Sequence, residues 1–225
     1  MGVHDGHRKR LKARFQEEGL EHFDEINALE LLLFYCIPRQ DTNIIAHALL
    51  EQFGTFAAVL EASPSELKKV KGVGDSIAGF LPLVMQTSRY YQVCRMKHAE
   101  ILPTVDKCGS YLVPYFIGRQ NETVYLLCLD AKCKVLCCKE AGEGSVNSAA
   151  VPIRRIVQMA LAANATSVVL AHNHPSGLAL PSADDVQTTH ALAAALKAVE
   201  ISLADHIVIA DDDYVSMVQS GLYHP

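Results

Sequence analysis

One segment in the last third of the chain places the tightest constraint on its fold. It begins with a β-branched apolar run, Thr166–Ala171, which predicts a buried strand, and it ends in a predicted helix over Ser182–Val199. His172 and His174 follow the strand, and residues two apart in a strand face the same side, so both imidazoles can converge on one point. A helix that starts beside that strand end brings Asp185, one turn in, toward the same point.

Two imidazoles and a carboxylate form the ligand set of a catalytic zinc ion, which keeps a fourth position for water. We therefore predict one Zn²⁺ per chain, held by His172, His174 and Asp185. Zinc lowers the pKa of bound water to about 7 and polarises a carbonyl, which suits hydrolysis at neutral pH. A plainer interpretation also fits: Ser182 and Asp185 form a Ser-x-x-Asp capping box, and a His-x-His pair arises by chance in a chain with ten histidines.

The predicted hydrolysis also needs a general base, and a carboxylate near the cation usually serves. The upstream candidates are Glu122, at the start of a predicted strand, and Glu140 and Glu143, in a predicted loop over Lys139–Val146. A strand end holds a side chain rigidly, and this position favours Glu122.

Length, charge and cysteine usage limit the class of protein. The 225 residues, half of them hydrophobic, can form one large domain or two small ones. The net charge of -5 argues against bulk electrostatic coating of nucleic acid, although it allows a local basic patch. Met1–Asp5 is polar and every uncharged apolar run is too short to cross a bilayer, so we expect no signal peptide and no membrane association.

The seven cysteines are odd in number and mostly have apolar neighbours, which predicts reduced thiols in a cytoplasmic protein. Cys133, Cys137 and Cys138 lie close in sequence. The last two are neighbours on a predicted strand, Cys133–Lys139, and point to opposite faces. We therefore interpret them as structural thiols rather than as a metal cluster.

The sequence pattern changes near residue 100 and predicts two domains, 1–98 and 103–225. The first is predicted to be all helical; its signals are an apolar helix over Asn27–Ile37, helices over Ile44–Phe53 and Asp75–Tyr91, and a capping box over Ser63–Glu66. The second mixes helices (106–117, 152–163 and 182–199) with strands (122–129, 133–139, 166–171, 207–210 and 214–217). The predicted fold class is α+β, with an all-helical domain followed by a mixed sheet flanked by helices.

The run His172-Asn173-His174-Pro175-Ser176-Gly177, followed by Ser182 and Asp185, resembles the His-x-His-x7-Ser-x2-Asp signature (JAMM motif) of JAB/MPN metallopeptidases. Its Asn and Pro-Ser-Gly variant resembles the bacterial RadC branch. The resemblance implies a mixed α/β domain whose curved sheet surrounds a zinc ion on His172, His174 and Asp185. It further implies that Ser182 supports the oxyanion and that Glu122 acts on the water.

Two further segments, Gly144-Ser145-Val146 and Asp205-His206-Ile207, are similar to RadC segments. A buried Asp205–His206 pair could orient a metal ligand by a hydrogen bond to it. The two residues of such a pair can also simply satisfy each other's hydrogen bonds within a core.

Resemblance extends to the predicted helical domain, where Gly6–Arg10 and Glu30–Tyr35 resemble the region that precedes the RadC JAB domain. Val70-Lys71-Gly72-Val73-Gly74 is similar to a helix-hairpin-helix turn, in which glycines let backbone N–H groups approach a phosphate. The implied DNA contacts are Lys68, Lys69, Lys71, Gly72 and Gly74. A Gly-x-Gly turn is also common without DNA, and the lysines equally fit a solvated face.

Three functions fit the sequence. The first is a cytoplasmic, RadC-like zinc hydrolase of the metallopeptidase or isopeptidase type, which cuts a peptide or isopeptide bond and is recruited, for instance to DNA, by its helical domain. The second is a DNA-binding accessory protein in DNA repair or recombination, with a structural or vestigial zinc site. The third is a zinc phosphodiesterase, a class that usually uses two metals about 3.5–4 Å apart. Substrate and oligomeric state stay open.

Overall fold

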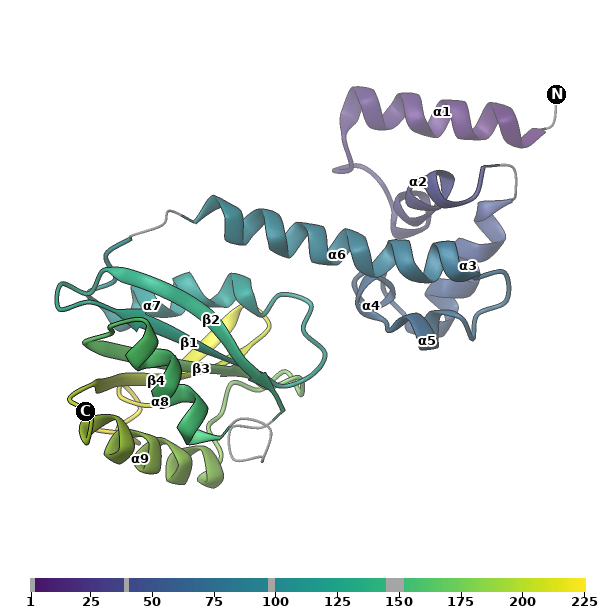
Figure 1. The fold of residues 1–225 in the computed structure, drawn as a ribbon. Coiled ribbons are helices and arrows are strands. Elements are labelled where there is room, and N and C mark those ends of the chain that lie inside the picture. The colour runs from purple at the N-terminus through teal and green to yellow at the C-terminus, as the bar shows by residue number, and fades with distance from the viewer. Residues whose placement is uncertain (1–2, 39–40, 97–99, 145–151) are drawn as a thin grey trace. The chain divides into compact units, whose positions relative to one another are not determined.

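The computed structural model describes residues 3–38, 41–96, 100–144 and 152–225 (Figure 1). The chain folds as two compact units, Met1–Ser88 and Arg89–Pro225. The division between them falls inside the helix α6 (Asp75–Arg95). The predicted boundary at residue 98 lies outside the described residues. Helices make up the first unit and a sheet flanked by helices makes up the second, so the predicted α+β class is confirmed.

Four helices of the first unit begin at a capping side chain. Side chains of Asp24, Asp41, Thr55 and Ser63 accept backbone N–H bonds at four helix starts, and Ser63 with Glu66 forms the predicted capping box. The helices are α1 (Val3–Glu18), α2 (Glu25–Cys36), α3 (Thr42–Phe53), α4 (Phe56–Glu61), α5 (Pro64–Leu67) and the first part of α6. Their core includes the fully buried side chains of Leu29, Leu33, Leu49, Leu67 and Leu81.

The second unit contains one five-stranded sheet of order β2-β1-β3-β4-β5. Strands β3 and β4 are parallel and the other neighbours are antiparallel, which makes the sheet mixed. The strands are β1 (Thr123–Leu129), β2 (Val135–Glu143), β3 (Ser167–Asn173), β4 (Ser202–Ala210) and β5 (Asp213–Ser216). The helices are α7 (Val105–Leu112), which continues as a 3-10 turn over Val113–Tyr115, α8 (Ile153–Ala162) and α9 (Ala183–Lys197).

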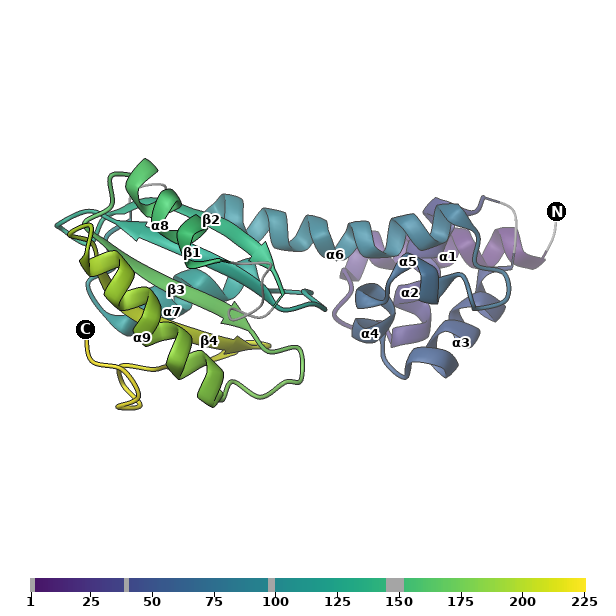
Figure 2. The same ribbon diagram turned by 60° about the horizontal axis from the view of Figure 1, so that its bottom comes forward.

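Alternation along the central strands gives the sheet two apolar faces. Even-numbered residues of β1 and β3, such as Leu126 and Leu170, pack with α8 and α9, while odd-numbered ones, such as Leu127 and Val169, pack with α7 (Figures 1 and 2). His172 continues the even-numbered series at the end of β3. The strand therefore directs its side chain to the face that α9 covers.

Three strands are longer than the sequence predicts. Strand β2 runs to Glu143 instead of ending near Lys139, because its ladder with β1 continues to the pair Thr123–Glu143. As an edge strand it is largely exposed and lacks apolar alternation. Strand β4 begins at Ser202 rather than Ile207, and polar residues buried within it break the apolar pattern there. Strand β3 extends through Asn173, which places His172 within the strand.

All seven cysteines are free thiols. Cys137 packs against the α8–α9 face and Cys138 against the α7 face, so the two neighbours point apart as predicted. In the part of the chain that the structure describes, no helix combines the length and the apolar character needed to cross a bilayer.

Candidate metal centre

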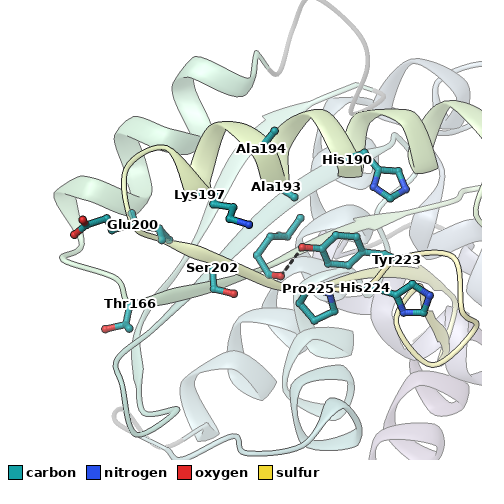
Figure 3. A pocket seen from close by; sticks show the side chains of 12 residues that line it. Thr166, His190, Ala193, Ala194, Lys197, Glu200, Ser202, Tyr223, His224 and Pro225 are labelled. Atoms are coloured by element: carbon teal, nitrogen blue, oxygen red, sulfur yellow. Dashed lines mark hydrogen bonds between the residues drawn. The ribbon is translucent and has the colours of Figure 1, made fainter.

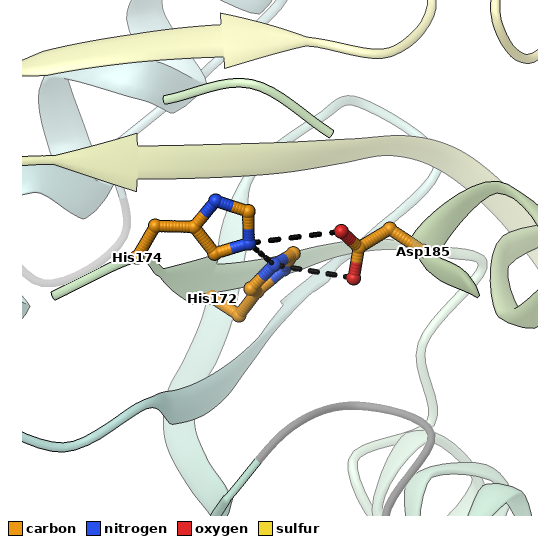
Figure 4. Close-up of side chains that lie close together, drawn as sticks. All are labelled: His172, His174 and Asp185. Atoms are coloured by element: carbon orange, nitrogen blue, oxygen red, sulfur yellow. Dashed lines mark hydrogen bonds and ion pairs between the residues drawn. The ribbon is translucent and has the colours of Figure 1, made fainter. Parts of the chain in front are cut away.

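The three predicted metal ligands meet at one point in the second unit (Figure 4). His172 lies in β3, one residue before its end, and His174 follows the strand with its backbone N–H bonded to the Ile209 carbonyl of β4 at 2.8 Å. Gly177 has a φ of 79°, which lets the chain turn back toward α9. Asp185 lies in the first turn of that helix. The ligand atoms of His172, His174 and Asp185 all lie within 4.8 Å of one another.

A chain of hydrogen bonds fixes which nitrogen of His172 carries its proton. The Thr189 hydroxyl donates to the Asp185 carbonyl (2.6 Å) and therefore accepts from Nδ1–H of His206 (2.6 Å). Nε2 of His206 is then an acceptor, and it faces Nδ1 of His172 at 2.8 Å. His172 therefore donates through Nδ1–H and keeps a lone pair on Nε2.

The second imidazole is oriented in the same way. Nδ1 of His174 lies 3.1 Å from the Leu178 carbonyl oxygen, which can only accept, so this nitrogen carries the proton and Nε2 keeps its lone pair. Burial lowers the pKa of His172 to about 4, which keeps that imidazole neutral at pH 7. Both Nε2 atoms are thus free to act as ligands.

Three acceptors face one another as a result. Nε2 of His172 lies 2.9 Å from Nε2 of His174 and 3.3 Å from Oδ1 of Asp185, while Nε2 of His174 lies 3.6 Å from Oδ2 of Asp185. Ligands about 2.0–2.1 Å from a tetrahedral zinc lie about 3.3–3.4 Å apart. The two contacts to Asp185, which use different carboxylate oxygens, are near this spacing, and the two Nε2 atoms are closer than it. Buried acceptors without donors between them are unfavourable, and a cation at their centre removes the repulsion. The donor set therefore fits a divalent metal ion.

Ser182 acts as the N-cap of α9. Its backbone N–H and its hydroxyl donate to Oδ2 of Asp185 (2.8 and 2.6 Å), and its hydroxyl oxygen accepts from the Asp185 backbone N–H (3.1 Å). The capping box is thus confirmed, and it also holds the Asp185 carboxylate toward the two histidines. In this arrangement the hydroxyl proton of Ser182 points at Asp185.

An open pocket of about 330 Å³ gives access to the cluster and contains the predicted base. Glu122, His174, Ser182 and Asp185 are among the residues that line it. Among the described residues, no hydrogen bond or ion pair to the Glu122 carboxylate is present.

The alternative bases are engaged elsewhere. Glu140 accepts from Arg119 (2.7 Å), and Glu143 accepts from Asn121 (2.6 Å). Both lie on β2 rather than in the predicted loop. The structure therefore brings Glu122, and neither of the other two, to the pocket beside the metal ligands.

The Asp205–His206 pair is split between two roles. His206 is fully buried and contacts His172 as described. The Asp205 carboxylate accepts from Ser216 Oγ (2.5 Å) and from the backbone N–H groups of Val218 (3.2 Å) and His206 (2.7 Å). Of the pair, only His206 contacts a predicted metal ligand, so the predicted orienting role is left to His206. Of the Gly144–Val146 segment, Ser145 and Val146 lie outside the described residues.

A larger pocket, of about 590 Å³, lies at the opposite end of the parallel strands (Figure 3). Thr166 and Ser202, at the starts of β3 and β4, line it together with residues of α9 and the last residues of the sequence. Tyr223 closes one side and donates to the Leu203 carbonyl at 2.9 Å. None of the predicted site residues lines this pocket.

The predicted DNA contacts lie together in the first unit. All five residues are exposed, while Val70 and Val73 between them are buried. Gly72 has a φ of 92°, and a Cβ on Gly74 would contact nothing within 4 Å. The Lys68 ammonium pairs with Asp75 at the start of α6.

Sequence reasoning missed two residues of the site. Thr189 lies four residues after Asp185 on α9, and this helical spacing was the available signal. Asn173 sits inside the histidine motif, where only its position pointed to a role.

Comparison with known proteins places this geometry in a family. A profile of the RadC-like JAB domain matches residues 102–222. The chain is 33% identical over 215 residues to a UPF0758 protein of Ruegeria pomeroyi, covering 96% of both chains. It is 32% identical over 210 residues to a UPF0758 protein of Paraburkholderia xenovorans, covering 93% of this chain and 83% of that protein.

Proposed function

Because this chain belongs to the family of RadC-like JAB domains, we propose that it is a zinc-dependent hydrolase that cuts a peptide or isopeptide bond. One observation carries the proposal: the ligand atoms of His172, His174 and Asp185 converge within 4.8 Å. The pocket beside them contains Glu122. We include a cytoplasmic location in the proposal, which the seven free cysteines support.

In this proposal His172, His174 and Asp185 hold one zinc ion per chain. When bound, zinc polarises a substrate carbonyl and lowers the pKa of water to about 7. Glu122 takes a proton from the attacking water and delivers it to the leaving nitrogen, which requires an unpaired carboxylate within reach of both. Ser182 donates to the developing oxyanion after its hydroxyl turns from Asp185 toward the pocket that it lines.

The test is digestion of a peptide library and of isopeptide-linked peptides. The zinc-loaded wild type should cleave a subset of them. His174→Ala should lose turnover with its zinc, and Glu122→Gln should lose about 10²–10⁴-fold in kcat while it keeps zinc. His190→Ala, which removes an exposed histidine of α9 outside the cluster, is the matched control and should behave as wild type.

Two results would contradict the proposal. Cleavage that persists in His174→Ala would mean that the activity does not depend on the cluster. Full activity of Glu122→Gln would remove that residue from the mechanism.

A second candidate is DNA binding by the helical unit, either to recruit the hydrolase or as the main function of an accessory protein in DNA repair. It is supported by the exposure of Lys69 and Lys71 beside two exposed glycines, Gly72 and Gly74, of which Gly74 has open space around its Cα atom. If the proposal holds, DNA affinity falls with salt and falls further in Lys71→Glu, while His174→Ala leaves it unchanged. Lys132→Glu carries the same charge change on an exposed turn of the other unit and controls for net charge.

A further inference from the structure

Asn173 lies between the two histidines of the metal cluster and has a contact set of its own. It is the last residue of β3 and only 5% exposed. Because side chains alternate along a strand, Asn173 points away from the face that His172 and His174 share. It follows the odd-numbered series of β3, on the opposite side of the sheet from α9.

The Asn173 amide binds the backbone on both sides of Glu122. Its Oδ1 accepts from the backbone N–H of Thr123 at 2.8 Å, and its Nδ2 donates to the carbonyl of Asn121 at 3.2 Å. A third and longer contact joins Nδ2 to the carbonyl of Arg119 at 3.4 Å. The two shorter bonds hold the two peptide groups that flank the Cα atom of Glu122.

Chemistry allows this amide one orientation. The Thr123 N–H can only donate, and the carbonyls of Asn121 and Arg119 can only accept. All three bonds therefore form only when Oδ1 of Asn173 faces Thr123 and its Nδ2 faces the two carbonyls. The Glu122 carbonyl is held separately, since it accepts from the Gly144 N–H at 2.7 Å. Glu122 thus has a fixed backbone directly before β1, while its carboxylate, which has no partner among the described residues, lines the pocket.

We propose that Asn173 is a positioning residue that sets the distance between Glu122 and the metal ligands. The segment His172–His174 would then place both imidazoles and the predicted base. The histidines lie on one face of the strand, and on the other face Asn173 clamps the Glu122 backbone by its two shorter bonds. The inference rests on the proposed function, in which Glu122 must reach both the water and the leaving nitrogen. Misplacement of a reacting group by about 1 Å can cost about 10²-fold in rate.

The decisive variant is Asn173→Ala, which removes both bonds and leaves every metal ligand in place. We expect zinc affinity within about threefold of wild type, an unchanged KM and a kcat lower by about 10²-fold. In a Glu122→Gln background, Asn173→Ala should lower kcat by less than about threefold further, because a residue that acts through Glu122 has nothing left to position. Asn164→Asp, at an exposed turn residue, provides a distant control.

Amide hydrogen exchange supplies a readout that needs no turnover. Asn173→Ala should remove the protection of the Thr123 amide and leave that of Leu126, in the middle of β1, unchanged. Asn173→Asp keeps the acceptor for Thr123 and loses the donor for Asn121, so it should retain Thr123 protection while kcat falls by an intermediate amount.

The results separate the two proposals. If the wild type cleaves no substrate, the proposed function fails, and the exchange data alone decide the inference: protection lost only around Thr123 supports it. Unchanged Thr123 protection overturns the inference, as does protection lost across the whole sheet. An equal loss of kcat from Asn173→Ala with and without Glu122 also overturns it, because the residue would then act by another route.

Discussion

At the scale of single residues, the direction of two imidazole N–H bonds determines what the cluster can bind. His172 donates toward His206 and His174 donates toward Leu178, so both Nε2 lone pairs face the Asp185 carboxylate. With either imidazole reversed, an N–H would point at the carboxylate and form an ordinary hydrogen bond. The buried network around the histidines therefore sets the orientation in which the predicted ligands can meet a cation.

This network predicts a role for His206 that can be measured without a substrate. His206→Leu removes the acceptor that holds His172 Nδ1–H, and the zinc affinity should fall by about 10–100-fold. Thr189→Val, which removes the hydroxyl that His206 donates to, should shift the affinity in the same direction by less. Competition with a chromophoric chelator measures both. Zinc affinities within twofold of wild type would show that the hydrogen bonds from Thr189 through His206 do not orient His172.

The buried histidine also predicts how the stability of the metal-free protein depends on pH. Burial lowers the pKa of folded His172 to about 4, below its ordinary value of 6.5. Between pH 4 and pH 6.5 the unfolded chain binds a proton at this imidazole that the folded chain does not bind. The contribution of His172 to the free energy of unfolding is therefore fully present above pH 6.5 and is lost as the pH falls toward 4. Burial lowers the pKa of His206 as well, which adds an effect of the same sign.

Urea unfolding in the presence of a chelator should therefore give a free energy of unfolding lower by about 2 kcal/mol at pH 5 than at pH 7.5 from His172 alone. His172→Asn should show a smaller difference between the two pH values. Equal stability at both would mean that the imidazole is not held neutral by the fold.

At the scale of elements, the α9 capping box supports the site, while a separate set of bonds joins β4 to the end of β5. Ser182 binds Asp185, one of the three predicted ligands, at the start of α9. Asp205 binds Ser216 and Val218 and so holds the chain after β5 onto β4. These contacts give Asp205 and His206 different roles although they are neighbours in sequence.

Substitution should separate those two roles. Asp205→Asn places an amide where the carboxylate accepts from three donors, and the free energy of unfolding should fall by about 1.5–3 kcal/mol. Zinc affinity should stay within about threefold of wild type, in contrast to His206→Leu. A loss of zinc affinity without a loss of stability would reverse this assignment.

The same elements show how far the sequence could predict the fold and the site. The buried strand before His172 and the capping box at Ser182 follow local rules of periodicity and hydrogen bonding, and both could be predicted. β4 could be predicted only in part, because the buried Asp205 and His206 interrupt the apolar pattern and are explained only by partners distant in sequence. The clamp of Asn173 on the Glu122 backbone spans 50 residues and depends on strand pairing, which no local pattern encodes.

At the scale of the whole molecule, the chain is two units with separate cores. The apolar clusters of the first unit draw on residues between Leu11 and Met85, and those of the second on residues between Met96 and Tyr223. Every residue of the candidate metal centre lies in the second unit. The proposed metal chemistry and the proposed recruitment by the helices therefore belong to different parts of the chain.

This organisation predicts that a fragment of residues 89–225 folds and binds one zinc ion with an affinity within about threefold of the full chain. The helical unit should in turn account for any DNA binding. Circular dichroism and chelator competition on the fragment test the first statement. A fragment that folds but does not bind zinc would show that the site needs the helical unit.

The most direct test of the account is the metal content of the purified protein after dialysis against trace zinc. Wild type and the His190→Ala control should each carry one zinc per chain. His172→Ala, His174→Ala and Asp185→Ala should each lose most of it while retaining the helical signal of the folded chain. A folded wild type without bound metal, or zinc that remains after removal of all three side chains, would contradict the claim that they share one cation.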